Sequence, residues 1–308
     1  MKHLISRRLR FAAAGLALTL AATGCGTIPA ADETGDDGTA SGTAEFSQEI
    51  HDRLPEAVRR RGAIRLATDP SYAPMESYGA DGRTIIGFEP DLAAALGSVT
   101  GLRVEMAAAD FGSMIDETNK GTYDGVLSSM TDTPERKKKI DFIDYFSAGL
   151  ALIVQRGNPQ GVTDLKDLCG QLVAAERGTV QVDMLRRTQP ACGASPIIIR
   201  TFKTNADALL QVRTGRAVAI LIDYPPAAHL ASDPRTRSQY QLASTVQYEP
   251  GLFGIAVAKD NPELRDALRD ALDQLIRSGR YADLLERWGL ANGAVATSSI
   301  NAGSGPDN

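Results

Sequence analysis

The sequence predicts an α/β protein of two lobes, each built around an open and mostly parallel sheet. Strand and helix patterns alternate between residues 63 and 127, and a second, smaller alternating set lies between residues 171 and 222. Two apolar runs, residues 150–155 and 248–258, are suited to strands that cross between the two sets. Ligands of such sheets bind at the carboxyl ends of the strands, so we expect the functional site there.

The chain has 308 residues, 43% hydrophobic and 23% charged, which is typical of a globular protein of one large or two medium domains. Residues 1–24 have a basic start, an apolar stretch and small residues before Cys25, which predicts a signal peptide. Small residues followed by Cys resemble a lipobox, which implies cleavage before Cys25 and acylation of its thiol. The alternative is plain secretion with a free thiol. We expect an extracytoplasmic protein that is lipid-anchored to the membrane.

Removing residues 1–24 leaves 29 basic residues against 38 acidic ones, a net charge of −9. This balance argues against nucleic acid as a partner and against a polybasic membrane patch. Residues 25–46 are almost entirely polar or small, so we expect a flexible tether between lipid and fold. Residues 291–308 are rich in Gly, Ser and Asn, which predicts a disordered tail.

The first lobe is expected from residues 47–152 and 248–290. It begins with a predicted helix at 47–61, capped by Ser47 and ended by Gly62, followed by a strand at 63–68 and a proline-containing loop at 69–74. A short strand at 84–88 leads to a helix that starts at Pro90 and stops at Gly101. A strand at 102–107, a helix at 112–120 and a strand at 123–127 complete this set. Two helices, 262–277 and 281–288, return to this lobe.

The second lobe is expected from residues 153–247. It has predicted strands at 171–175, 196–200 and 217–222 and helices at 179–187 and 205–213.

The strand at 123–127 runs into a hydroxyl-rich turn, and Pro134 then opens a helical segment that carries Arg136. The hydroxyls of Ser128, Ser129 and Thr131, backbone N–H groups at the turn and a guanidinium fork are what a bound carboxylate needs. The alternative is a capped helix with a surface arginine.

Three cysteines are an odd number. If Cys25 is lipidated, Cys169 and Cys192 remain in one lobe, 23 positions apart, in a compartment that permits a disulfide. We expect this bridge. There is no CxxC pair or Cys/His cluster and there are only three histidines, so we expect neither a metal site nor a cofactor.

Six segments in order resemble one family, the extracellular solute-binding proteins (family 3) of ABC transporters for polar amino acids. They are residues 68–74 (TDPSYAP), 87–92 (GFEPDL), 124–136, 177–179 (RGT), 221–225 (LIDYP) and 279–288. The resemblance covers about residues 62–290 and is greatest to the lysine/arginine/ornithine and histidine binders. It implies the periplasmic-binding-protein type II fold, also called a Venus flytrap, with two hinge-crossing strands near Leu152 and Phe253.

The resemblance also implies roles for single residues. The α-carboxylate clamp of the family falls on Arg136, with help from Ser129, Thr131 and the backbone near Gly178 and Thr179. The acidic partner of the α-ammonium corresponds to Asp223. The aromatic residue that stacks on the ligand side chain corresponds to Tyr72, and an apolar wall residue corresponds to Phe111. The alternatives are ordinary core positions for Tyr72 and Phe111 and a helix N-cap for Asp223.

The preferred amino acid stays open. Asp69 matches a position that in the basic-amino-acid binders faces the distal cation of the ligand. Arg177, at the cleft lip, would instead disfavour a basic ligand and favour Glu, Asp or Gln.

The implied function is binding of a polar amino acid between the lobes and its delivery, by a monomer, to the permease of an ABC importer. Burying a zwitterion requires a partner for each charge, and Arg136 and Asp223 supply them from different lobes. Two alternatives remain. One is a cyclohexadienyl (arogenate) dehydratase on the same fold, which needs a general acid such as Glu76 or Asp69. The other is an amino-acid sensor module.

Overall fold

The computed structural model describes residues 45–304. The predicted signal peptide, Cys25 and the predicted tether up to residue 44 lie outside the described residues, as do residues 305–308. Among the helices of the described part, none has the length and apolar character needed to cross a membrane.

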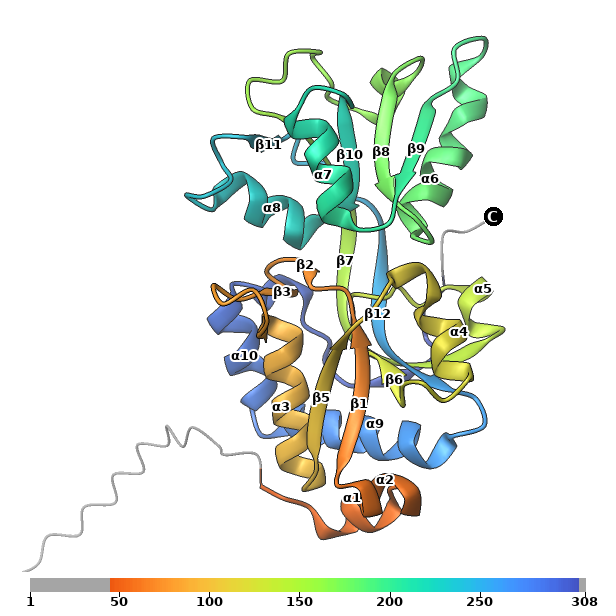
Figure 1. Cartoon of the computed structure of the whole chain (residues 1–308), viewed down its shortest axis with the longest axis vertical. Helices are drawn as coiled ribbons and strands as arrows, with labels where there is room; N and C mark the ends of the chain where they lie inside the picture. Colours follow the sequence, from red (N-terminus) through yellow and green to blue (C-terminus); the bar gives the residue numbers. More distant parts are fainter. Residues whose placement is uncertain (1–44, 305–308) are drawn as a thin grey trace, which may run out of the picture. The chain divides into compact units, whose positions relative to one another are not determined.

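One mixed ten-stranded sheet runs through both lobes, with strand order β5-β1-β6-β12-β7-β10-β8-β9 and with β11 and β13 paired to β7 (Figure 1). Its strands are β1 (Ala63–Thr68), β5 (Arg103–Ala108), β6 (Gly125–Val126), β7 (Ile140–Gln155), β8 (Leu172–Glu176), β9 (Ile198–Phe202), β10 (Ala219–Asp223), β11 (Tyr240–Leu242), β12 (Tyr248–Ala258) and β13 (Ser299–Ile300). A separate three-stranded sheet consists of β2 (Ser71–Tyr72), β3 (Glu76–Tyr78) and β4 (Ile85–Ile86). The predicted parallel pairing is present within each lobe, between β1, β5 and β6 and between β8, β9 and β10.

The first lobe contains β1–β6 and the helices α1 (Gln48–Arg53), α2 (Glu56–Arg61), α3 (Phe88–Thr100), α4 (Met114–Asn119), α5 (Pro134–Lys137), α9 (Pro262–Arg277) and α10 (Arg280–Trp288), with 3₁₀ turns η1 (Phe111–Ser113) and η4 (Ala291–Gly293). Adjacent residues of β1 alternate between two cores, because Leu66 packs with α3, α9 and α10 while Ala67 packs with α4. Helices therefore cover both faces of this part of the sheet.

The second lobe contains β8–β11, the helices α6 (Val180–Thr188), α7 (Asn205–Arg213) and α8 (Tyr224–Ser232), and the 3₁₀ turns η2 (Leu165–Leu168) and η3 (Gln189–Cys192). Here Val173 packs in the core that contains α6, and Ala174 packs in the core that contains α7 and α8. The same three-layer arrangement is thus repeated at smaller size.

Two antiparallel strands, β7 and β12, connect the lobes side by side (Figure 1). Phe146 of β7 lies in the first-lobe core and Leu150 in a second-lobe core, so β7 crosses at residues 147–149. Likewise, β12 crosses between Tyr248 and Phe253. The expected crossing near Leu152 is wrong, because Leu152 is only 2% exposed inside the second lobe. The apolar residues of β7 continue into the cores of both lobes, so an apolar run in the sequence does not locate the crossing.

The predicted helix at 47–61 is two helices, since Pro55 stands between α1 and α2 and cannot donate a helical N–H bond. Ser47 caps the first, accepting from the Ile50 N–H at 3.3 Å, and Gly62 ends the second at a φ of +73°.

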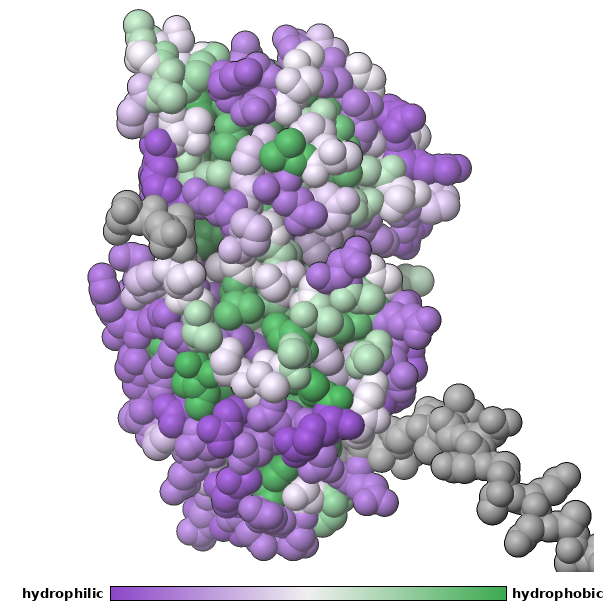
Figure 2. All heavy atoms as spheres, turned by 180° about the vertical axis from the view of Figure 1, so that it is seen from behind, coloured by the Kyte–Doolittle hydropathy of each residue, from purple (hydrophilic) through white to green (hydrophobic). Residues whose placement is uncertain are grey.

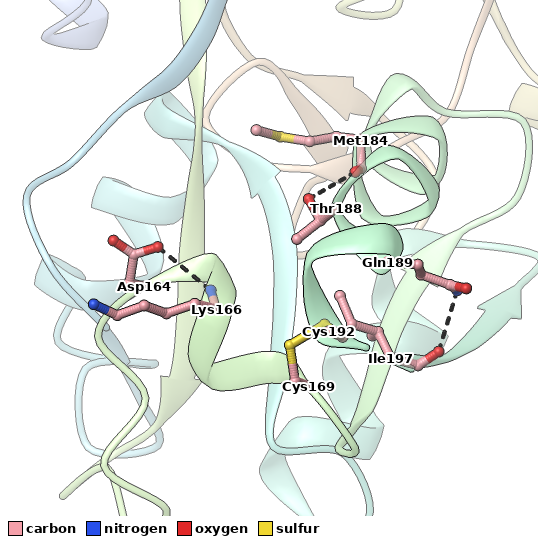
Figure 3. Close-up of a disulfide and its surroundings, with 8 residues drawn as sticks. All are labelled: Asp164, Lys166, Cys169, Met184, Thr188, Gln189, Cys192 and Ile197. Carbon is pink, nitrogen blue, oxygen red and sulfur yellow. Dashed lines mark hydrogen bonds between the residues drawn. A yellow bond between two sulfur atoms is a disulfide. The ribbon is translucent and has the colours of Figure 1, made fainter. Parts of the chain in front are cut away.

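The predicted disulfide between Cys169 and Cys192 is present (Figure 3). It joins the residue that follows η2 to the last residue of η3. Close to it, the Gln189 side chain donates to the Ile197 carbonyl at 3.2 Å, so the loop before β9 is held by both a covalent and a polar link.

The prediction of a disordered tail from residue 291 is wrong for residues 291–304. η4 follows α10, and β13 pairs with β7 at Ile143 and Asp144. Composition alone predicted disorder because Gly, Ser and Asn bury little apolar surface, but here the segment is held by backbone and side-chain hydrogen bonds.

Figure 2 shows the face opposite to that of Figure 1, with hydrophobic residues in separate patches among hydrophilic ones. The exposed large hydrophobic side chains of the described part are Phe46, Tyr78, Ile86, Ile198 and Val246, and among them only Tyr78 and Ile86 lie on strands that pair with each other. Scattered exposed apolar residues of this kind need no functional explanation.

Candidate functional site

A cavity lies between the two lobes, with about 440 Å³ of empty space including its opening to solvent. Nine of the eleven predicted ligand-binding residues line it: Asp69, Tyr72, Phe111, Ser128, Ser129, Thr131, Arg136, Thr179 and Asp223. Asp69, Ser128, Glu176 and Asp223 stand at or just after the carboxyl ends of β1, β6, β8 and β10, where this class of sheet binds ligands. Glu76, named above only as a candidate general acid, also lines the cavity. Sequence reasoning missed six further lining residues: Glu176, Val180, Gln181, Asn205, Leu221 and Ile222.

Arg136 provides a fixed guanidinium on one side of the cavity. Its Nη1 donates to the Thr131 carbonyl at 2.8 Å and its Nη2 to the Gly178 carbonyl at 3.0 Å, so it contacts both lobes. The guanidinium carbon lies 5.5 Å from the centre of the Phe111 ring, within cation–π range. Burial lowers the pKa of Arg136 to about 10, which leaves it charged at neutral pH.

Gly178 and Arg177 do not line the cavity. Gly178 has a φ of +82°, and a Cβ added there would lie 3.0 Å from the Gly112 backbone, so a glycine permits the lobes to approach closely. The Arg177 side chain is exposed and outside the cavity lining, and the expected effect of its charge on the ligand stays a prediction.

Asp223 faces Arg136 across the cavity from the end of β10 and is 3% exposed. The Tyr72 hydroxyl donates to its Oδ2 at 2.6 Å, and the Gln181 amide donates to the same oxygen at 3.1 Å. Within residues 45–304, the buried Oδ1 has no hydrogen-bond partner. Burial raises the pKa of Asp223 to about 7.

The alternative role of Asp223, as the N-cap of a helix, is supported by its position but not by its hydrogen bonds. It is the N-cap residue of α8, but its side chain makes no capping hydrogen bond. Its carboxylate is therefore held for the cavity and not for the helix end.

Asp69 and Glu176 form a buried carboxyl pair, 6% and 8% exposed, at the ends of β1 and β8. The two groups are close enough to hydrogen-bond when one is protonated. Burial raises the pKa of Asp69, and burial together with Asp69 raises the pKa of Glu176 to about 10. Asp69 Oδ2 and Glu176 Oε1 find no partner in the described part of the chain.

The sequence carried a signal for Glu176. It is the last residue of β8, one beyond the predicted strand, and carboxyl ends of strands were the expected site.

The structure directs the hydroxyls of Ser128 and Ser129 to buried carboxylates. Ser128 donates to Glu76 Oε1 at 2.8 Å, and both the hydroxyl and the N–H of Ser129 donate to Glu89 Oε1 at 2.8 Å. Both hydroxyls already donate to protein acceptors, and their expected contact with a bound anion stays a prediction. Their contribution is to order the turn beside Arg136.

The lining residues carry four carboxyl groups, Asp69, Glu76, Glu176 and Asp223, against the single guanidinium of Arg136. Burial is the largest cause of a raised pKa in each of the four acids. Glu176, with a pKa of about 10, keeps a proton at neutral pH that a cation could displace. An acidic ligand would add negative charge to this set, whereas a basic one would balance it.

The chain matches the model of the bacterial extracellular solute-binding proteins, family 3, over residues 64–291. A curated relative, the arginine-binding protein ArgT of Corynebacterium glutamicum, is 32% identical over 259 residues, which are 82% of this chain and 83% of the relative. The arginine-binding extracellular protein ArtP of Bacillus subtilis is 30% identical over 228 residues, 72% of this chain and 84% of that protein.

Solved structures agree on the fold. An ancestral arginine-binding protein bound to arginine has a TM-score of 0.68 and 29% identity, covering 74% of this chain and 98% of that one. An ancestral amino acid-binding protein described as a precursor of cyclohexadienyl dehydratase has a TM-score of 0.67 and 33% identity, covering 75% and 97%. The predicted two-lobed type II binding-protein fold with two crossing strands is thereby confirmed, and both curated relatives are named as binding proteins rather than enzymes. From the matched segment, the fold and the cavity between its lobes, we conclude that the chain belongs to the bacterial extracellular solute-binding proteins, family 3.

Proposed function

We propose that the protein binds a basic L-amino acid, with arginine preferred, and delivers it to an ABC importer in the membrane. The observation that carries this proposal is the Asp69–Glu176 carboxyl pair, buried in the same cavity as Arg136 and Asp223.

The α-carboxylate and the α-ammonium of an amino acid match the opposite charges of Arg136 and Asp223. The guanidinium of Arg136 would pair with the α-carboxylate, for which a planar fork of N–H donors is well suited. The α-ammonium would donate to Asp223 Oδ1, a buried oxygen that the protein leaves without a donor in the described residues. Tyr72 holds the other carboxylate oxygen and would pack beside the ligand side chain.

The carboxyl pair would accept the distal cation of the side chain. A guanidinium presents donors along several edges and can engage Asp69 and Glu176 together, whereas an ammonium is a compact point charge. This difference favours arginine over lysine and ornithine. Two relatives named as arginine-binding support the choice, and the exposed position of Arg177 outside the cavity lining weakens the case for an acidic ligand.

Binding would favour closure because the ligand contacts both lobes. Arg136, Asp69 and Tyr72 come from the first lobe, while Asp223 and Glu176 come from the second. A ligand bound to both sets stabilises the closed form over the open one by its differential affinity. We extend the proposal to a monomer that is acylated at Cys25 and held near its permease.

Isothermal titration of the purified chain against arginine, lysine, ornithine, histidine, glutamine and glutamate tests the proposal. We expect arginine to bind most tightly and glutamate not to bind. Preference for glutamate or glutamine, or no binding by any amino acid, would contradict it. Incubation with arogenate belongs in the same experiment, since burial raises the pKa of acids that line the cavity and turnover would identify a dehydratase instead.

A further inference from the structure

The segment of residues 299–303, which we call the C-terminal strap, lies beyond residue 291, where the family match ends. It begins as β13, paired with β7 at Ile143 and Asp144. Asn301 continues the attachment, since its N–H donates to the Phe142 carbonyl at 3.1 Å and its side-chain oxygen accepts from the Phe142 N–H at 2.8 Å. The strap is therefore fixed along β7 by backbone and side-chain bonds together.

Two buried aspartates bind the strap. Asp144, fully buried, accepts from the Ser299 hydroxyl at 2.8 Å and from the Ala302 N–H at 3.1 Å through Oδ2. Asp132, 1% exposed, accepts from the Gly303 N–H at 2.6 Å. Lys137 donates to the carbonyls of Asn301 and Gly303. Without the strap, both carboxylates would lose donors in an environment where unpaired charge is costly.

The end of the strap fits closely against the protein. A Cβ added at Gly303 would lie 2.2 Å from the Asp132 carbonyl oxygen and 2.7 Å from the Asp132 side chain. Any residue other than glycine must therefore displace the strap end or the turn that contains Asp132.

That turn is the one that holds Arg136. Asp132 lies between Thr131, whose carbonyl accepts from Arg136 Nη1, and Thr133, whose hydroxyl accepts from the Arg136 N–H at 3.2 Å. Lys137 is the next residue after Arg136 in α5. The strap thus contacts one residue inside the Arg136-bearing turn and one residue of its helix.

We propose that the C-terminal strap is a positioning element for the ligand site: by binding Asp132 and Lys137, it fixes the turn at residues 131–137 and so the direction of the Arg136 guanidinium. The strap itself does not line the cavity. It acts through the turn, and its loss would loosen the turn while leaving Asp223 and the second lobe unchanged.

Gly303→Ala in the full chain is the test, with Ala302→Ser, at an exposed strap position, as the matched control. Hydrogen exchange of the ligand-free protein should be faster at the amides of residues 131–137 in Gly303→Ala, and unchanged in α7. The control should match the parent. Unchanged exchange at residues 131–137 in Gly303→Ala would overturn the proposal.

A second pair of variants tests the strap without a new side chain. Deleting residues 299–308 removes the strap, whereas deleting residues 305–308 keeps it. We expect the first deletion to speed exchange at residues 131–137 and to weaken arginine binding roughly tenfold, on the scale of a lost charge-assisted hydrogen bond. The effect on arginine rests on the proposed function, but the exchange result does not, so the two can fail separately. Equal exchange in both deletions would contradict the strap's role.

Discussion

The hydroxyl of Tyr72 donates to Asp223 Oδ2 at 2.6 Å and accepts from the Asp223 backbone N–H at 2.8 Å. The two residues are 151 positions apart and belong to different lobes. One phenol thereby joins the lobes and holds the carboxylate that faces Arg136 across the cavity.

Tyr72→Phe should weaken arginine binding roughly tenfold and lower the Tm of the ligand-free protein by a few degrees, because Asp223 loses one donor and its N–H loses an acceptor. Titration calorimetry and thermal melts measure the two effects. Tyr78→Phe, at a half-exposed position, is the control and should change neither. Unchanged affinity in Tyr72→Phe would show that the phenol does not position Asp223.

Arg136→Ala and Asp223→Asn should each abolish most binding, by roughly a hundredfold or more, while the fold is retained. Each variant leaves one ligand charge buried without its partner. Circular dichroism checks the fold and calorimetry the affinity. Arg177→Ala, which changes an exposed arginine outside the cavity, should bind like the parent, and a large loss there would return Arg177 to the site.

Glu176→Gln should reduce arginine affinity roughly tenfold or more, because one of the two carboxyl groups that would bind the guanidinium of the ligand is lost. The ratio of arginine affinity to glutamine affinity should fall as well. Glu135→Gln, on the exposed start of α5, is the matched control. Retained preference in Glu176→Gln would leave Asp69 alone as the distal partner.

Arginine binding should release about one proton at pH 8. The pKa of Glu176, raised to about 10 by burial and Asp69, means that it is protonated when the cavity is empty, and a cation beside it favours ionisation. Affinity should therefore rise with pH above about pH 7, as long as the α-ammonium of the ligand stays protonated. Calorimetry in buffers of different ionisation enthalpy counts the protons. Release that persists unchanged in Glu176→Gln would assign the proton to another group.

The stability of the ligand-free protein should fall as pH rises. Burial raises the pKa of Asp144 to about 6, of Asp223 to about 7 and, together with Asp69, of Glu176 to about 10, all above the values of unfolded carboxyls. The folded state then binds more protons than the unfolded state, so this stabilisation is complete below about pH 4 and is lost as pH rises through each folded pKa. Urea unfolding at pH 6, 7.5 and 9 should give decreasing free energies of unfolding, and Glu176→Gln should flatten the upper part of the curve. A free energy of unfolding that rises from pH 6 to pH 9 would contradict this prediction.

Replacing Cys169 and Cys192 together by Ser should lower stability by about 3 kcal/mol, as expected for a closed loop whose ends are 23 positions apart. The bridge lies in the second-lobe loop region and neither cysteine lines the cavity, so arginine affinity should be retained. Denaturant unfolding measures the first quantity and calorimetry the second. A large loss of affinity would mean that the bridge shapes α6 and Gln181.

Local sequence patterns were enough to predict the alternation of strands and helices, the residues at the strand ends, the segment that carries Arg136 and the cysteine pair. Each depends on local pattern, because hydrophobic period, prolines and glycines act over a few residues. Even so, the apolar run of β7 did not reveal where that strand leaves one core for the other.

Which side chains face the cavity depends on packing between segments that are distant in sequence. Glu176 lines the cavity while its neighbour Arg177 is exposed, since successive residues at a strand end point in different directions. The hydroxyls of Ser128 and Ser129 are directed to Glu76 and Glu89, which are 52 and 40 positions away in the sequence. The strap is ordered by partners on β7 and α5. These outcomes depend on groups distant in sequence, whose meeting is decided by packing rather than by local pattern.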